Sequence, residues 1–394
     1  MLKAASGIAL LLAVTTMAPG EEVTVQNGHL LVDGKPFFAI GMYSVGERDL
    51  PAVADAGFNL VHTYGWEGEN TFDGGQEWLD TCEANGLKAL VGLYRPPVKE
   101  SEFAGAIRRI EQFRDHPALL AWHTMDEPGW EQEGNRGDVY MPAAYEVCRE
   151  HDPNHPVTAV VCHFADPARF ADSVDVMQAD YYCVPPIPAK NFSGTGFRGV
   201  KQFVDYTRRA DPEMPYWYVA QFFDWSVSKE NSYELPPEWQ RGPTLEEMRC
   251  ATYTAVASGA RGVLYWSLSR AMGSDWHRDS LSRVQRWNDL CSIVDELNAL
   301  MPVLTSTERE VIRERDRVVS MVKSDGDNVW LIACNYERKP TETQLVVPGV
   351  RAGTLEMPFR DEAANIEDGA VTVRFEPLEA RVYRLVDDGS LERF

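Results

Sequence analysis

Residues 101–128 read SEFAGAIRRIEQFRDHPALLAWHTMDEP, and this stretch decides the fold. Its first half places apolar residues at the three- and four-residue spacing of an amphipathic helix. Its second half, ALLAWHTM, is almost wholly apolar, which is typical of a strand covered on both faces, as in a parallel sheet. Asp126, Glu127 and Pro128 end the strand with two carboxylic acids and a proline. The stretch therefore predicts a helix followed by a buried strand with a polar end.

The same alternation recurs on both sides of this stretch. The predicted strands cover 37–43, 59–65, 87–95, 118–128, 157–163, 174–184, 215–225 and 262–269. The predicted helices cover 47–57, 74–86, 101–117, 140–156, 168–173, 199–214, 244–259 and 281–300. Eight such units in about 260 residues suit a closed α/β barrel of the (β/α)₈ (TIM) type. A doubly wound open sheet is the alternative, but no GxGxxG or GxxxxGK[ST] motif follows any strand.

Two further segments flank the barrel. Two alternating runs joined at Asn27-Gly28, a dipeptide that favours tight turns, predict a hairpin before the first barrel strand. After Met301-Pro302 the pattern changes to short alternating strands separated by Gly, Pro, Asp and Asn. We therefore predict a (β/α)₈ barrel with its hairpin over 19–304 and a small β-sandwich domain over 305–394.

The amino end and the charge balance indicate where the protein works. Residues 1–18 hold one lysine, a short apolar run and small residues, as in a cleaved secretory signal, so we expect a secreted or periplasmic protein. The apolar run is shorter than the roughly 20 residues of a membrane span, and no later stretch is long and apolar enough. With 60 acidic and 38 basic residues the net charge is −22, which disfavours nucleic acid as a partner.

Polar and aromatic residues gather at the predicted strand ends, which form one rim of a parallel barrel. The set comprises Tyr43, His62, Tyr64, Trp66, Tyr94, Arg95, His123, Asp126, Glu127, His163, Asp180, Tyr181, Tyr182, Gln221, Asp224, Trp225, Trp266 and Ser267. Sugar rings stack on aromatic side chains and their hydroxyls need polar partners, so a carbohydrate substrate fits this mixture. A partly buried carboxyl such as Glu127 has the raised pKa that a general acid needs.

The stretches 116–128, 215–225 and 262–269, with the β-rich tail, resemble the large clan of retaining glycoside hydrolases built on (β/α)₈ barrels. In that clan the fourth strand ends in Asn-Glu-Pro, whose Glu is the acid/base. The seventh strand ends in a nucleophilic Glu, and an aromatic residue, usually Trp, ends the eighth. The resemblance implies a glycoside hydrolase that needs no cofactor.

Carried onto this chain, the resemblance implies Glu127 as the acid/base and Trp266 as the platform under the sugar. Asp126 replaces the Asn that contacts the sugar 2-hydroxyl. Gln221 stands at the nucleophile position, and a neutral amide cannot form the glycosyl ester of a double displacement.

Three hypotheses follow from Gln221. In the first, Asp180 or Asp224 is the second catalytic carboxylate, and an inverting reaction then needs the carboxyls about 6.5–9.5 Å apart. In the second, a substrate group is the nucleophile, with Asp126 beside Glu127. In the third, the barrel binds carbohydrate without cleaving it.

The remaining predictions concern the site and its alternatives. The catalytic candidates are Glu127, Asp180 and Asp224, and the substrate-binding candidates are Tyr43, His62, Tyr64, Trp66, Arg95, Asp126, His163, Tyr182, Gln221 and Trp266. A divalent metal held by strand-end histidines is the weaker alternative, because the first strand lacks His-x-His, so we predict no metal. Seven cysteines without CxxC spacing give no zinc or redox motif, and a buried Cys162 is expected to pack as a small apolar residue.

Overall fold

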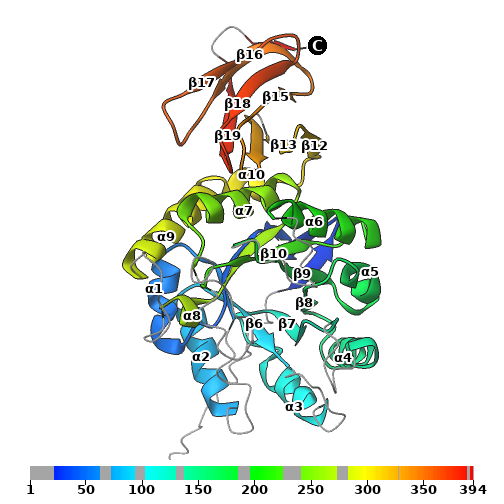
Figure 1. Ribbon diagram of the computed structural model, residues 1–394. Coiled ribbons are helices and arrows are strands. Elements are labelled where there is room, and N and C mark those ends of the chain that lie inside the picture. Colours follow the sequence, from blue (N-terminus) through cyan, green and yellow to red (C-terminus); the bar gives the residue numbers. More distant parts are fainter. Residues whose placement is uncertain are drawn as a thin grey trace, which may run out of the picture.

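The computed structural model describes residues 22–62, 72–93, 103–129, 137–184, 196–224, 241–272, 283–326, 328–387 and 391–393. A ring of helices surrounds a barrel of strands, and a β domain that contains the carboxyl end sits on one side of that ring (Figure 1). The predicted rim residues Tyr64, Trp66, Tyr94, Arg95 and Trp225, and the expected signal at 1–18, lie outside the described residues. Within the described ranges, no helix combines the length and apolar character that crossing a membrane requires.

Eight parallel strands form the barrel, which confirms the predicted fold class. The closed order is β10-β11-β4-β5-β6-β7-β8-β9. Their bounds are β4 Ala39–Met42, β5 Leu60–His62, β6 Lys88–Gly92, β7 Leu119–Asp126, β8 Val157–Val161, β9 Val176–Asp180, β10 Tyr216–Gln221 and β11 Gly262–Trp266. Every residue of β8, β9 and β10 is buried, as expected for strands with the barrel interior on one face and helices on the other.

Helices cover the outside of the barrel. They are η1 Glu47–Asp49, α1 Leu50–Asp55, α2 Phe72–Ala84, α3 Phe103–Phe113, α4 Gly137–His151, α5 Asp166–Phe170, η3 Ala171–Ser173, α6 Arg198–Ala210, α7 Leu245–Ala257, α8 Leu268–Met272, α9 Arg283–Ala299 and α10 Met301–Thr305. Helix α6 buries Val200, Phe203, Val204 and Thr207, which lie on one face at helical spacing. Helix α7 is buried almost all round, because the β domain covers the face that the barrel leaves open.

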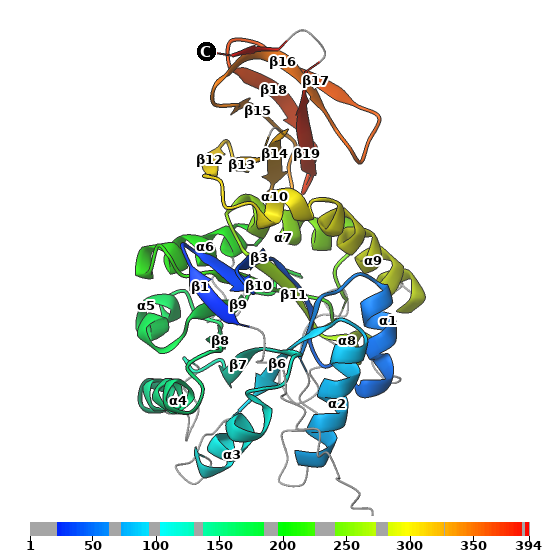
Figure 2. The ribbon, with the colours of Figure 1, turned by 180° about the vertical axis from the view of Figure 1, so that it is seen from behind.

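A small antiparallel sheet lies at the amino ends of the barrel strands. It contains β1 Val23–Gln26, β2 His29–Val32 and β3 Lys35–Phe37, visible in front of the barrel in Figure 2. The expected turn at Asn27-Gly28 is present, and Asp33-Gly34 makes a second one; all four residues have positive φ, as two-residue hairpin turns require. Leu30 packs with the interior side chains of the barrel, so this sheet closes the end opposite the site.

The β domain contains two sheets. One holds β12 Val311–Arg315, β13 Val318–Asp325, β14 Asn328–Asn335, β16 Val350–Glu356, β17 Ala363–Ile366, β19 Ala380–Val386 and β20 Glu392–Arg393, and the other pairs β15 Thr341–Val346 with β18 Ala370–Phe375. Helix α10 ends at Thr305 and β12 begins at Val311, so the chain changes from helix to strand close to the predicted boundary.

Candidate active site

The carboxyl ends of the barrel strands position the candidate site. Asp126 and Asp180 are the last residues of β7 and β9, and Gln221 and Trp266 are the last residues of β10 and β11. Because parallel strands of a closed barrel all end at one rim, these side chains share the face opposite the small sheet.

Strand β7 ends irregularly, and this irregularity positions Glu127. Its pairing with β8 shifts register between His123 and Asp126, and Glu127 has a φ of 46°. Its amide still donates to the carbonyl of Val160 at 2.8 Å. A bulge next to an active site re-aims a side chain, and a left-handed non-glycine residue costs about 1–3 kcal/mol, which surrounding contacts must offset. Glu127 is therefore held in a conformation that a regular strand would not give it.

The carboxyl groups of Glu127 and Asp180 lie together at the ends of β7 and β9. One oxygen atom of each group lies within 4.8 Å of the other. Burial raises the pKa of Glu127, and the negative charge of Asp126 raises it further. Burial, then the charges of Glu127 and Asp126, raise the pKa of Asp180 well above its usual range. The pair keeps a proton at a pH where isolated carboxyls are ionised.

Asp126 is bound from behind by a histidine. Its Oδ1 lies 2.8 Å from Nε2 of His123, and its carboxyl remains one-third exposed. His62 packs beside His123 with ring centroids 5.1 Å apart, and Tyr43 packs on His62 at 4.7 Å. Burial, with the charge of His123, lowers the pKa of His62 to about 3, so His62 is neutral near neutral pH. Asp126 is thus the carboxylate that this corner presents to the rim.

Tyr43 is directed into the barrel. Only 1% of its surface is exposed, and its hydroxyl donates to Oε1 of Gln178 at 2.8 Å. Gln178 in turn donates from Nε2 to the hydroxyl of Thr158 at 2.8 Å. Tyr43 therefore supports the floor of the site from inside the barrel.

Three aromatic rings line the rim beside Asp180. Tyr182 meets Phe223 edge-on with centroids 5.0 Å apart, and Phe223 meets Trp266 edge-on at 4.9 Å. Tyr182 and Trp266 are 6.0 Å apart, and both are partly exposed. Asp180 also shares a hydrogen bond with Tyr182, so the aromatic group adjoins the carboxyl pair.

The side chain of Gln221 is tied to backbone. Its Oε1 accepts from the amide of Val184 at 3.0 Å, and its Nε2 donates to the carbonyls of Val184 and Phe223 at 2.5 and 3.1 Å. Both amide hydrogens are used, and the residue is 5% exposed. Gln221 therefore joins the segment after β9 to the end of β10.

Asp224 lies deeper than the carboxyl pair. It is 1% exposed, and its charge acts on the buried guanidinium of Arg286, whose pKa burial lowers and Asp224 partly restores. The carboxyl that the structure brings to Glu127 is Asp180.

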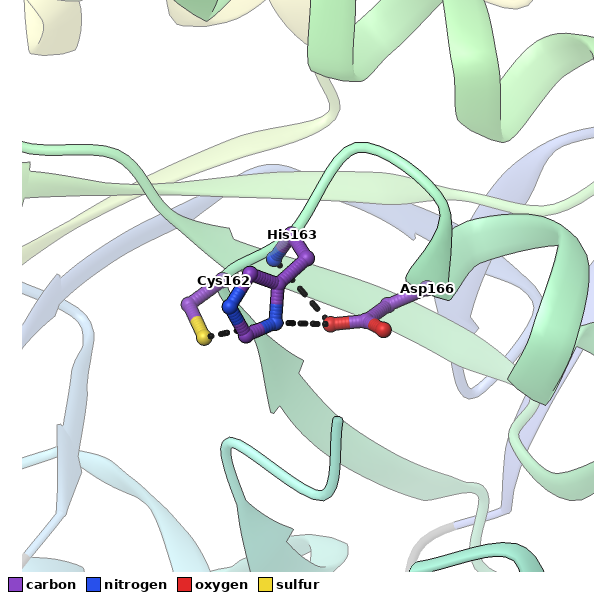
Figure 3. Close-up of side chains that lie close together, drawn as sticks. All are labelled: Cys162, His163 and Asp166. Carbon is purple, nitrogen blue, oxygen red and sulfur yellow. Dashed lines mark hydrogen bonds and ion pairs between the residues drawn. The ribbon is translucent and has the colours of Figure 1, made fainter. Parts of the chain in front are cut away.

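Sequence reasoning missed Cys162 and Asp166 as members of the rim. The Sγ of Cys162 lies 3.5 Å from Nδ1 of His163, and the same Nδ1 lies 3.3 Å from Oδ2 of Asp166. Figure 3 shows the three side chains turned toward one another after β8. The sulfur also lies within 4.8 Å of a carboxyl oxygen of Glu127. The sequence signal that could have revealed them is the adjacent pair of Cys162 and His163 at the end of a predicted strand.

Asp166 also explains a glycine in the loop after Glu127. A Cβ on Gly129 would lie 2.2 Å from Oδ1 of Asp166, so no side chain fits there unless Asp166 moves. The Glu-Pro-Gly sequence therefore lets the loop after β7 approach the loop after β8 closely.

Solved structures provide a comparison for this architecture. An α-amylase from Anoxybacillus shares 9% identity at a TM-score of 0.57, over 86% of this chain and 89% of its own. An α-amylase from Geobacillus thermoleovorans, complexed with acarbose, shares 10% identity at a TM-score of 0.56, over 87% and 91%. A GH30 endoxylanase from Clostridium papyrosolvens shares 11% identity at a TM-score of 0.51, over 92% and 99%.

Sequence comparison gives no family. No family model matches the chain, and no curated protein matches it in sequence. The structural likenesses extend over most of the length of both partners, at identities at which only the fold is informative. The chain therefore has the (β/α)₈ fold of these glycoside hydrolases.

Proposed function

We propose that this protein cleaves glycosidic bonds in a poly- or oligosaccharide outside the cytoplasm, with Glu127 as the general acid. The observation that carries the proposal is the close approach of the Glu127 and Asp180 carboxyls, within 4.8 Å, at the barrel rim. A glycosidic bond breaks when the departing oxygen receives a proton, so the enzyme needs a carboxyl that is still protonated near neutral pH. Burial and the charge of Asp126 give Glu127 that property.

Asp180 has the role of proton partner in this proposal. After Glu127 gives its proton to the departing oxygen, its new negative charge lies beside Asp126 in a buried site. Because the pKa of Asp180 is raised well above its usual range, Asp180 keeps a proton of its own and can donate it in a hydrogen bond to that carboxylate, which stabilises it. The two carboxyls have oxygen atoms within 4.8 Å of one another, closer than the about 6.5–9.5 Å separation of an inverting pair. Asp180 therefore supports the acid, and the water that adds to the sugar carbon returns a proton to the Glu127 carboxylate.

The rim also supplies groups for binding the sugar. Trp266 and Tyr182 offer apolar ring faces next to the acid, where a pyranose ring can stack. Asp126, kept in place by His123, is assigned to the sugar hydroxyl beside the reacting carbon. The solved α-amylase that carries acarbose has the same fold and supports a carbohydrate as the occupant.

A second candidate function is carbohydrate binding without cleavage. It is favoured by Gln221, whose amide stands at the end of β10 with its hydrogens bonded to backbone. A barrel that keeps the aromatic rings but has no nucleophile at that position binds glycans and releases no product.

A cleavage assay with one substitution separates the two functions. The purified protein is incubated with a panel of polysaccharides, and released reducing ends are measured. Glu127→Gln is expected to lower cleavage about 10²–10⁴-fold while glycan binding is retained. Glu146→Gln, on the exposed face of α4, is the matched control and keeps full activity. Binding by both proteins with no cleavage of any polysaccharide supports the second candidate, and cleavage by Glu127→Gln at the wild-type rate removes Glu127 from the mechanism.

A further inference from the structure

Cys162, His163 and Asp166 present three different ligand atoms to one point. Sγ of Cys162, Nδ1 of His163 and one carboxylate oxygen of Asp166 all lie within 4.8 Å of one another. Figure 3 shows the sulfur and the carboxylate on two sides of the same ring nitrogen. A single Nδ1 carries either a proton or a lone pair. When Nδ1 is protonated it donates toward Asp166 and, more weakly, toward the sulfur; when it is not, its lone pair can bind a cation that the sulfur and the carboxylate share.

Two of the three distances between ligand atoms match edges of a tetrahedral zinc site, and the third, between sulfur and oxygen, is within 4.8 Å. Zinc binds sulfur at about 2.3 Å, imidazole nitrogen at about 2.05 Å and carboxylate oxygen at about 2.1 Å, and tetrahedral angles then put S and N about 3.6 Å apart and N and O about 3.4 Å apart. The structure has 3.5 Å between Sγ and Nδ1 and 3.3 Å between Nδ1 and Oδ2. One thiolate, one imidazole and one carboxylate are also a ligand set that zinc accepts.

The surroundings hold these three groups in place. The amide of His163 donates to Oδ2 of Asp166 at 3.0 Å, and Gly129 leaves room for the other oxygen. Such contacts around a ligand orient it. Asp166 is 2% exposed and Cys162 is 3% exposed, whereas the side chain of His163 is 27% exposed and gives a route from solvent.

We propose that Cys162, His163 and Asp166 bind one Zn²⁺ ion, with the fourth position left to a water or a ligand hydroxyl. Binding replaces the thiol proton with the metal and releases that proton to solvent, with no change of oxidation state. The site adjoins Glu127, whose carboxyl contacts the thiol. It is argued from the ligand geometry alone and stands whether or not the protein cleaves glycans.

Metal titration of the full chain tests the site. The protein is stripped with a chelator and titrated with Zn²⁺ by calorimetry, then with Co²⁺ in the spectrophotometer. The expected result is one ion per chain and, with Co²⁺, a thiolate-to-cobalt absorption band in the near ultraviolet. Cys162→Ser is expected to remove that band, and His163→Gln and Asp166→Asn are expected to weaken Zn²⁺ binding by more than about tenfold.

The controls keep the result interpretable. Cys82→Ser changes another buried cysteine, in α2, and is expected to leave affinity and spectrum unchanged. Circular dichroism checks the fold of each variant; if Cys162→Ser does not fold, the near-isosteric Asp166→Asn decides. No bound ion in the wild type, or equal binding by wild type and the folded ligand variants, overturns the site and leaves a hydrogen-bonded cluster only.

Discussion

The carboxyl groups of Glu127 and Asp180 have oxygen atoms within 4.8 Å of one another, although Glu127 follows β7 and Asp180 ends β9, and these strands are not neighbours in the barrel. Strand β8 runs between β7 and β9, so the contact crosses the rim above it. The contact depends on the left-handed backbone at Glu127, because a regular strand would alternate its side chains between interior and exterior. The raised pKa of Glu127 therefore depends on its backbone conformation as well as on burial.

Removing the charge of Asp126 should change the pH dependence of cleavage. A general acid works while protonated, so activity falls as the pH rises through the pKa of Glu127. Burial raises that pKa, and the negative charge of Asp126 raises it further. Asp126→Asn removes the second cause and lowers the pKa of Glu127. The alkaline limb of kcat/KM should therefore move to lower pH, as measured on a glycan that the wild type cleaves.

Asp138→Asn is the control for this shift, since Asp138 is exposed at the start of α4 and pairs with Arg169. Its pH profile should match the wild type. An alkaline limb that stays in place in Asp126→Asn, or moves to higher pH, contradicts Glu127 as the acid that responds to Asp126.

Asp180→Asn should stabilise the protein at neutral pH. The folded-state pKa of Asp180 is raised, first by burial and then by the charges of Glu127 and Asp126. A group whose pKa rises on folding binds its proton more tightly in the folded state, so stability falls as pH rises above the unfolded-state value of 3.8. Asparagine carries no titrating group and avoids this loss. The melting temperature of Asp180→Asn relative to wild type should therefore increase between pH 4 and pH 8.

Asp152→Asn should show the opposite trend, which makes it a matched comparison. Burial raises the pKa of Asp152, but contacts from His155, Trp122 and the amide of Asn154 outweigh burial and lower it. A lowered pKa adds stability above the unfolded-state value, and this stability is lost as the pH falls through the folded-state value. Asp152→Asn should thus be destabilised most at neutral pH. If the stability of both variants relative to wild type changed with pH in the same direction, folding would not raise the pKa of Asp180 and lower that of Asp152.

The barrel could be predicted because its physical signal is local. Strands buried on both faces are apolar runs such as YWYVAQ, and each is followed by a helix with one apolar face. The second turn of the amino-terminal sheet, at Asp33-Gly34, could have been predicted from the same kind of dipeptide as the turn at Asn27-Gly28. The fold therefore follows from patterns that a short window of sequence contains.

The contacts of the site could not be predicted, because they depend on geometry between strands. Nothing in the letters of β7 marks the register shift that turns Glu127 toward Asp180. Gln221 was assigned to substrate binding from its strand-end position, while its bonds to the backbone of Val184 span 37 residues. The contacts among Cys162, His163 and Asp166 could not be predicted, because they depend on the path of the loop after β8. Residue types at the rim were predictable, and their partners were not.

Gln221→Glu should destabilise the protein and leave glycan cleavage without gain. A carboxylate cannot donate to the carbonyls of Val184 and Phe223, and it places a charge in a site that is 5% exposed. Losing these bonds costs about 2–5 kcal/mol, because buried acceptors lose their donor and a charge is buried. Urea unfolding measures the change. A stable variant with increased cleavage would contradict this account and indicate that residue 221 reaches the substrate.

The junction between barrel and β domain provides the last prediction, which concerns Glu247 in α7. Its carboxylate accepts from both Nη atoms of Arg241 at 2.6 and 2.7 Å, and from Arg338 of the β domain at 2.6 Å. It also completes the capping box of α7 with Thr244.

Glu247 is 3% exposed, and Glu247→Gln leaves the two arginines without their charged partner. Because Arg241 and Arg338 are 35% and 48% exposed, losing the charged hydrogen bonds should cost about 1.5–3 kcal/mol. Glu246→Gln, on the exposed face of the same helix, should change stability by less than about 0.5 kcal/mol. Urea unfolding followed by tryptophan fluorescence compares the variants, and equal midpoints would mean that apolar packing alone, including α7 against β14, holds the β domain on the barrel.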